Sequence, residues 1–144
     1  MISRTAIAFL ALATSLSANA APKWVELPHS VADMSFIDQS SAVVYGQFVD
    51  VNVLRNFDNT VVLGNDPATG KDMYSHRSVR LSYRVDCDSR KLSLTSWEMY
   101  EGKFGNGDVV WANTNWSKPA YLAAVDDETR AVLDSACAIN TASR

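Results

Sequence analysis

The chain has 144 residues and a formal net charge of −3, with 47% apolar side chains. This length is typical of a single domain. The mildly acidic balance argues against a general role in binding nucleic acid or an anionic membrane surface.

The first twenty residues are predicted to be a cleaved signal peptide. Arg4 precedes an apolar run at 6–13, and residues 18–20 (Ala-Asn-Ala) form the small-x-small pattern that signal peptidase recognises. The run is shorter than the roughly 20 residues that span a bilayer, so a retained anchor is the less favoured alternative. No cysteine lies at the cleavage site, so a lipid anchor is not expected. We therefore expect residues 21–144 to be one exported domain with no membrane span, in the periplasm, secreted or at the cell surface.

The chain up to residue 72 is predicted to be extended and then irregular. Residues 24–27 and 35–38 are predicted as short strands, and residues 42–54 (AVVYGQFVDVNVL) as one long strand. Gly46 within it indicates a bulge or a close approach of another backbone. Residues 56–72 are rich in turn-forming residues, so we expect a surface loop, with at most a short strand at 61–63.

Two strands show how the faces of the predicted sheet should divide. Alternate residues of a strand point to opposite faces. One face should therefore carry Val49, Val51 and Val53 in the first strand and Val79, Leu81, Tyr83, Val85 and Cys87 in the second. The opposite face should carry Asp50 and Asn52, and then Ser78, Arg80, Ser82, Arg84 and Asp86. This pattern predicts one buried face and one solvated face.

A hairpin continues from residue 87 through a turn at 88–90, after which Leu92 and Leu94 return to the buried face. The alternation then breaks. A bulge near Thr95-Ser96 would return Trp97 to the core. In the alternative, Trp97 and Met99 are exposed on the other face and bind a partner.

The last third of the chain is predicted to hold a turn, a strand and a helix. Residues 101–108 contain three glycines and form the turn, and residues 109–111 form the strand. Residues 126–128 (Asp-Asp-Glu) begin the helix, because acidic side chains favour its first turn. The apolar face of the helix should carry Val125, Thr129, Val132, Leu133 and Ala136, and the helix should end at Cys137.

Cys87 and Cys137 are the two cysteines, and in an exported chain they are predicted to form a structural disulfide. Neither a Cys-x-x-Cys motif nor zinc-finger spacing is present, so a redox or metal site is not indicated. The predicted fold is α+β, an antiparallel sheet with the C-terminal helix packed on one face and tied by this bond.

Taken in order, these features resemble the surface-adhesin protein E family from Trp24 to Cys137. The matching pieces are Trp24-Val25, Phe36-Ile37-Asp38 followed by Ser40 and Ser41, Tyr83-Arg84-Val85-Asp86-Cys87, Tyr100, Gly107-Asp108-Val109-Val110, Trp116 and Pro119. Ala136 departs from the valine expected there, and residues 56–72 match no motif of the family. The resemblance implies an antiparallel sheet with a packed helix and, as for the adhesin that gives the family its name, attachment to host proteins of plasma and extracellular matrix.

Catalysis is not indicated by the residues. His29 and His76 are expected at the surface, and Asp86 and Asp88 are expected to be solvated in the turn. No nucleophile with a base, pair of working carboxylates or set of metal ligands is evident. We therefore expect a non-enzymatic binding domain without cofactor or metal.

Two features are candidates for binding a partner. Arg80, Arg84, Arg90 and Lys91, together with Arg77 and against Asp86 and Asp88, give residues 76–91 a local charge of +3. This stretch is either an ordinary solvated strand face or a docking patch for an acidic partner. The second feature is an aromatic group that should be mostly core, with one or two exposed anchors. It comprises Trp97, Tyr100, Phe104, Trp111, Trp116 and Tyr121.

Two functions follow from this sequence. The favoured one is an adhesin-like domain that binds host or neighbouring-cell proteins, including extracellular-matrix or plasma proteins. The alternative is a periplasmic envelope protein or an inhibitor of the lysozyme-inhibitor kind, with no adhesive role. The sequence does not indicate the oligomeric state.

Overall fold

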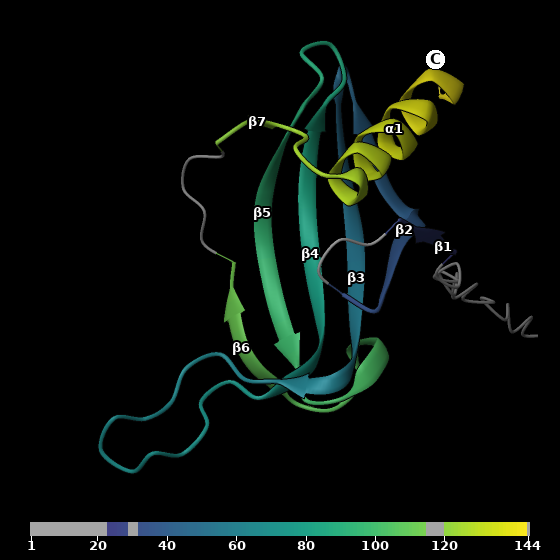
Figure 1. The fold of residues 1–144 in the computed structure, drawn as a ribbon. Coiled ribbons are helices and arrows are strands. Elements are labelled where there is room, and N and C mark those ends of the chain that lie inside the picture. The colour runs from purple at the N-terminus through teal and green to yellow at the C-terminus, as the bar shows by residue number, and fades with distance from the viewer. Residues whose placement is uncertain (1–22, 29–31, 115–119, 144) are drawn as a thin grey trace, which may run out of the picture.

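A computed structural model describes residues 23–28, 32–114 and 120–143; the predicted signal peptide lies outside them. The elements in chain order are β1 (Trp24–Leu27), β2 (Met34–Tyr45), β3 (Phe48–Val61), β4 (His76–Asp86), β5 (Lys91–Tyr100), the 3₁₀ turn η1 (Lys103–Gly105), β6 (Val109–Asn113), β7 (Leu122–Ala123) and α1 (Asp127–Ala142). Figure 1 shows one twisted sheet with α1 lying across one side of it.

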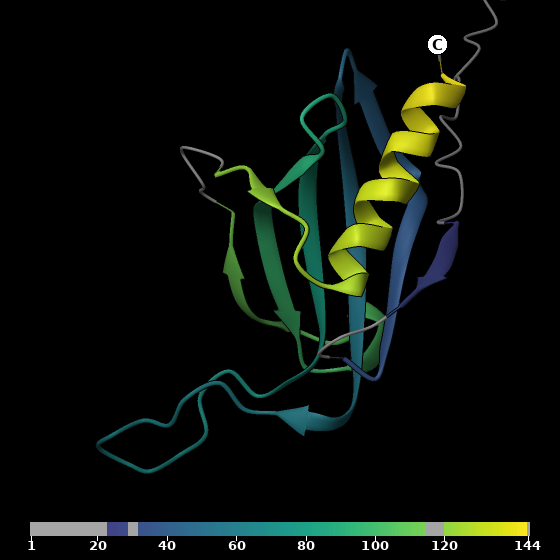
Figure 2. The ribbon, with the colours of Figure 1, turned by 45° about the horizontal axis from the view of Figure 1, so that its top comes forward.

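The sheet is an antiparallel meander in which β1 to β6 are neighbours in chain order, and β7 pairs with the start of β5. The helix packs mainly over β2 and β3 and leaves β5 and β6 to the side, as Figure 2 shows. We call the side that carries α1 the inner face and the opposite side the outer face. The predicted fold, an antiparallel sheet with a C-terminal helix on one face, is confirmed.

The core lies on the inner face, as the alternation of apolar residues predicts. Its buried side chains are Ile37, Val49, Val51, Val53, Val79, Leu81, Tyr83, Val85, Leu92 and Met99 from the sheet and Val132, Leu133 and Ala136 from the helix. Burying a valine or leucine side chain contributes about 1.5–3 kcal/mol. The helix is therefore held chiefly by its apolar face.

The prediction of one strand at residues 42–54 was wrong. A two-residue turn at Gly46 and Gln47 separates β2 from β3, and residues 35–38 belong to the same strand as 42–45. Gly46 has a φ of +62°, which glycine adopts readily at the first position of a tight hairpin turn. The sequence hid this turn because Val43 and Val44 are both apolar, so the change of phase across it could not be seen.

The loop predicted at 56–72 begins later than expected, because β3 continues to Val61. The segment between β3 and β4 projects away from the sheet at its lower end (Figure 1). His76 was predicted at the surface but is buried at the start of β4. Its ring meets Phe57 edge-on at 5.8 Å, and its Nδ1 lies 2.9 Å from the carbonyl oxygen of Tyr74. His29 lies outside the described residues.

The bulge predicted near Thr95-Ser96 is confirmed. Ser82 pairs with Ser96 whereas Tyr83 pairs with Leu94, so Thr95 is the extra residue. The shift returns Trp97 and Met99 to the inner face. The alternative in which both residues are exposed on the other face was therefore wrong.

The helix begins with a capping box, in which the Asp126 carboxylate accepts a hydrogen bond from the backbone N–H of Thr129 and the Thr129 side chain reaches back to the Asp126 backbone. Glu128 is not an exposed helix-start charge. It is fully buried, and its Oε1 accepts a hydrogen bond from Arg55 Nε at 2.7 Å. Its second oxygen has no hydrogen-bond partner among the described residues. This ion pair ties the first turn of α1 to β3.

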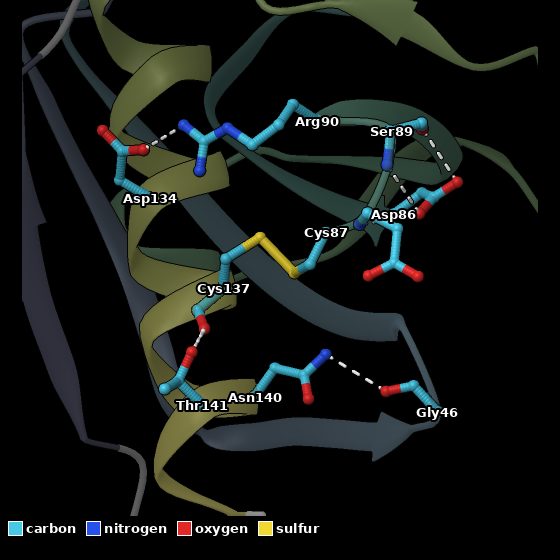
Figure 3. The surroundings of a disulfide bond; sticks show 10 residues. Gly46, Asp86, Cys87, Ser89, Arg90, Asp134, Cys137, Asn140 and Thr141 are labelled. Atoms are coloured by element: carbon cyan, nitrogen blue, oxygen red, sulfur yellow. Dashed lines mark hydrogen bonds and ion pairs between the residues drawn. A yellow bond between two sulfur atoms is a disulfide. The ribbon is translucent and has the colours of Figure 1, made fainter.

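The disulfide between Cys87 and Cys137 is present and joins the end of β4 to α1, as Figure 3 shows. The helix was predicted to end at Cys137, but it continues to Ala142. In the added turn, Asn140 is buried and its side-chain amide donates to the carbonyl of Gly46. This last turn therefore holds the β2–β3 hairpin, a contact that no sequence pattern indicated.

Candidate functional site

The outer face of the sheet carries three of the four predicted binding residues, Arg80, Arg84 and Lys91. Arg80 and Arg84 lie on β4 and point away from the core, as the alternation predicts. Arg90 instead turns toward α1 and pairs with Asp134 (Figure 3). Lys91 is exposed on the outer face at the start of β5, where its partner in register is Asp86. The structure therefore does not bring the four side chains together into one patch.

Arg84 contacts both an acid and an aromatic ring at the upper end of the outer face. It donates two hydrogen bonds of 2.9 Å to the Asp50 carboxylate on β3, and its guanidinium lies 5.3 Å from the ring centre of Tyr45. Tyr45 itself donates to Asp50 at 2.9 Å. Burial and this hydrogen bond raise the pKa of Tyr45 to about 12. The group is thus a fixed array of an arginine, an acid and an aromatic ring.

Arg80 repeats this arrangement lower on the same face. Its guanidinium lies 3.4 Å from the Glu98 carboxylate on β5 and 5.3 Å from the ring centre of Tyr100. Tyr100 donates a 2.6 Å hydrogen bond to Glu98. Burial, and then this bond, raise the pKa of Tyr100 above its ordinary value. Arg80 and Arg84 are four residues apart on one strand, hence about 13 Å apart.

The positive charge counted along residues 76–91 is therefore largely balanced by acids from other strands and from the helix. Asp50 comes from β3, Glu98 from β5 and Asp134 from the helix. A charge count along the chain could not show these pairs, because their partners are distant in sequence.

A hollow of about 220 Å³ opens at the lower end of the outer face, beside Arg80. It is lined by Trp24, Phe36, Leu54 and Phe104. Trp24 is 40% exposed and Phe104 is 53% exposed, whereas Leu54 at the floor is buried. Sequence reasoning included Phe104 in the aromatic group but missed the other three. Leu54 could have indicated the hollow from the sequence. It follows Val53 in β3, so its apolar side chain points to the otherwise polar outer face.

Buried polar side chains hold the loop that carries Phe104. The backbone N–H of Phe104 donates to Asn56 Oδ1 at 2.6 Å, and that of Gly105 donates to Ser78 Oγ at 2.9 Å. Ser78 in turn donates to the carbonyl of Gly102 at 2.6 Å. Both Asn56 and Ser78 are fully buried. Ser78 was expected on a solvated face, but this loop covers it.

The other aromatic residues divide between the two faces. Trp97 and Trp111 meet edge-on on the inner face, with ring centres 4.9 Å apart. Tyr121 packs against Phe48 at the upper end of the outer face. Trp116 lies outside the described residues. Most of the group is therefore packed, and Phe104 is its exposed member in the described part of the chain.

The described residues show neither a cluster of metal ligands nor a membrane-spanning helix. Within residues 23–28, 32–114 and 120–143, no three histidine, cysteine or acidic side chains gather to hold a metal ion. The described helix is too short and too polar to cross a bilayer.

Several solved structures resemble this one. Crystal form II of Haemophilus influenzae protein E matches with a TM-score of 0.59 at 20% identity, covering 94% of this chain and 99% of that one. Another structure of Haemophilus influenzae protein E matches with a TM-score of 0.58 at 22% identity, covering 92% and 94%. Protein E from non-typeable Haemophilus influenzae matches with a TM-score of 0.52 at 19% identity, covering 92% and 95%. At such identities the likeness shows a shared fold.

No curated protein sequence matches this chain. The sequence model of the surface-adhesin protein E family, in contrast, matches residues 24–138, which include every strand and most of α1. The resemblance noted from the sequence is thereby confirmed, and this chain belongs to the surface-adhesin protein E family.

Proposed function

We propose that this chain is an exported, non-enzymatic domain that acts as an adhesin by binding a host extracellular-matrix or plasma protein through the outer face of its sheet. Membership of a surface-adhesin family supports the class of function. The choice of the outer face comes from the arrangement of its side chains.

The observation that carries this proposal is the pairing of each outer-face arginine with an aromatic ring, the exposed Tyr45 and the buried Tyr100. Arg84 lies over Tyr45 at the upper end, and Arg80 lies over Tyr100 above the hollow. Arginine, tyrosine and tryptophan are the residue types that contribute most often to binding energy at protein interfaces. The helix covers the other side of the sheet and leaves this face open to a partner.

The arginines act in this proposal as oriented hydrogen-bond donors and stacking surfaces rather than as free charges. Each already has an acidic neighbour, and a guanidinium has five N–H donors, so it can keep that neighbour and still bind a partner. Arg90 is engaged with Asp134 of the helix, and we assign the exposed Lys91 a peripheral role in binding. Binding should therefore weaken only moderately as salt rises.

The experiment measures binding of residues 21–144 to a panel of purified host plasma and matrix proteins by surface plasmon resonance. The double substitution Arg80→Gln with Arg84→Gln should weaken the strongest interaction at least tenfold. Arg130→Gln, which removes an exposed arginine from the helix, is the matched control and should have no effect. Equal binding by all three proteins would exclude the outer face as the binding surface.

Location separates this proposal from the periplasmic alternative. An adhesin must reach the outside of the cell, whereas an envelope or inhibitor protein need not. Protease added to intact cells should therefore degrade the protein, while a periplasmic marker protein stays intact. Full protection of the protein until the outer membrane is opened would contradict an adhesive role.

A further inference from the structure

We propose that the hollow at the lower end of the outer face receives one large, uncharged apolar side chain of the protein partner, and that Phe104 is the residue that anchors it. This inference rests on the proposed function and names the chemistry of the group that is bound. Three properties of the hollow lead to it: its lining, the conformation of Phe104 and the charges around its rim.

The lining is apolar and its size suits a single side chain. Trp24, Phe36, Leu54 and Phe104 come from four separate elements, and the rings of Phe36 and Phe104 lie 6.3 Å apart in a tilted contact. A volume of about 220 Å³ equals about seven water molecules at roughly 30 Å³ each. Such a space accommodates one bulky side chain but not a long acyl chain.

Phe104 is held in a conformation that a phenylalanine rarely adopts. Its φ is +58°, in the left-handed region where a Cβ is disfavoured. The hydrogen bonds that the backbone N–H groups of Phe104 and Gly105 donate to Asn56 and Ser78 hold the loop in this shape, and the ring is left half exposed. Sustained strain of this kind gathers at ligand-binding sites, because the surrounding structure must enforce it. The ring is therefore already in position before a partner arrives.

The charges around the rim disfavour an anionic ligand. Lys103 Nζ pairs with Asp58 at 2.6 Å, and Arg80 pairs with Glu98. Glu26 adds an exposed acid on the same face, where it pairs in register with Phe36. A carboxylate or phosphate would meet cations that are already paired and an acid nearby. The hollow therefore complements an uncharged apolar group such as a tryptophan, phenylalanine or leucine side chain.

The first experiment needs no knowledge of the partner. Residues 21–144 labelled with ¹⁵N are titrated with N-acetyl-tryptophan amide, which is neutral, and with N-acetyl-tryptophan, which carries a carboxylate. We expect saturable shifts of the Phe104 and Gly105 amide signals with the neutral probe and at least fivefold weaker binding of the anionic one. No shift, or equal binding of both probes, would overturn the proposal.

Phe104→Gly is the informative variant. Glycine accepts a positive φ without strain, so the loop should keep its shape while the ring is lost. The neutral probe should bind at least tenfold more weakly, and the other amide signals should stay in place. Tyr74→Ser, which removes an exposed ring from the segment between β3 and β4, is the control and should bind the probe normally. Unchanged probe binding by Phe104→Gly would contradict the assignment.

The same variant is then tested on the host protein found in the binding assay. We expect Phe104→Gly to weaken that complex at least tenfold. If it binds at full strength while the arginine double variant fails, the hollow is not used although the proposed function stands. Two results would show that the occupant is another one, and the proposal would then fail. One is that sedimentation shows self-association of the wild-type protein that Phe104→Gly abolishes. The other is that decanoate, a short acyl chain, binds more tightly than the neutral probe when both are followed by these amide signals.

Discussion

The two faces of the sheet are built from the same alternating strands, yet different kinds of contact stabilise them. The inner face is covered by α1 and closed by valines, a buried ion pair and the disulfide. The outer face carries partly exposed pairs, in which Arg84 meets Asp50 and Arg80 meets Glu98, and an open hollow. The inner face therefore holds the fold together, and the outer face can change with little loss of stability.

This difference follows from how far each contact is from water. A charge pair at the surface is screened by solvent and contributes between zero and about 1 kcal/mol. Removing one partner of a buried pair leaves a charge in a medium that solvates it poorly, at a cost of several kcal/mol. The predictions below test this difference on the side of the helix, at the disulfide, Glu128 and Asp126, and on the outer face at Arg84.

The largest effect is expected from replacing both Cys87 and Cys137 with serine. The bond joins residues separated by 50 positions, and for a loop of this length the chain-entropy model gives about 4 kcal/mol. Urea unfolding of the exported protein should show this loss in the free energy of unfolding. Reduced wild-type protein serves as the control and should unfold with the variant. A loss below about 1 kcal/mol would mean that packing alone holds the helix.

Glu128→Ala should be nearly as costly, at about 3 kcal/mol of unfolding free energy. This value is the low end for a broken buried pair, because the Arg55 side chain keeps 19% of its surface exposed and can be partly solvated. Asp127→Ala removes an exposed acid from the same helical turn and should cost less than about 1 kcal/mol.

A second variant separates the charge from the packing. Arg55→Leu combined with Glu128→Leu replaces the whole pair with apolar groups, and should recover most of the stability lost in Glu128→Ala. If the single and double variants unfold alike, the ion pair is not what holds the first turn of the helix to β3.

Asp126→Ala should cost about 1 kcal/mol at neutral pH, the usual effect of losing a helix N-cap. The hydrogen bond from the Thr129 backbone holds the pKa of Asp126 below its ordinary value of 3.8. The stability that the carboxylate contributes is therefore fully present above pH 3.8 and is lost as the pH falls through the lower pKa of the folded state. Urea unfolding at several pH values should show the two proteins converging in acid. A difference that stays constant down to the lowest pH would contradict this assignment.

The smallest effect is expected from Arg84→Gln on the outer face. The pair with Asp50 is more than one-third exposed on both sides, so its loss should change the free energy of unfolding by less than about 1 kcal/mol. Thermal unfolding followed by circular dichroism measures this. A loss of 2 kcal/mol or more would show that the outer face is also structural, and the binding defect proposed for the arginine double variant could then be a folding defect.

The sequence by itself determined the fold class, because its signals are local. Alternation from Val79 to Val85 and the acids at Asp126–Glu128 each depend on a few neighbouring residues. The disulfide needed only that an exported chain has two cysteines. These signals predicted the buried face, the start of the helix, the bulge at Thr95 and the disulfide. Local signals failed where phase was ambiguous, as at the Gly46 turn, where two adjacent valines match either register.

Tertiary structure alone decided the candidate site. Arg84 and Asp50 are neighbours only because β3 and β4 pair, and Trp24 of β1 and Phe104 of η1 line the same hollow although they are distant in sequence. The same long-range pairing buried Ser78 under the loop that it holds. Period-two alternation states which face a side chain points to but not what covers it, since coverage depends on segments distant in the chain. For this reason the polarity of the outer face was predictable, whereas its paired charges and its apolar hollow were not.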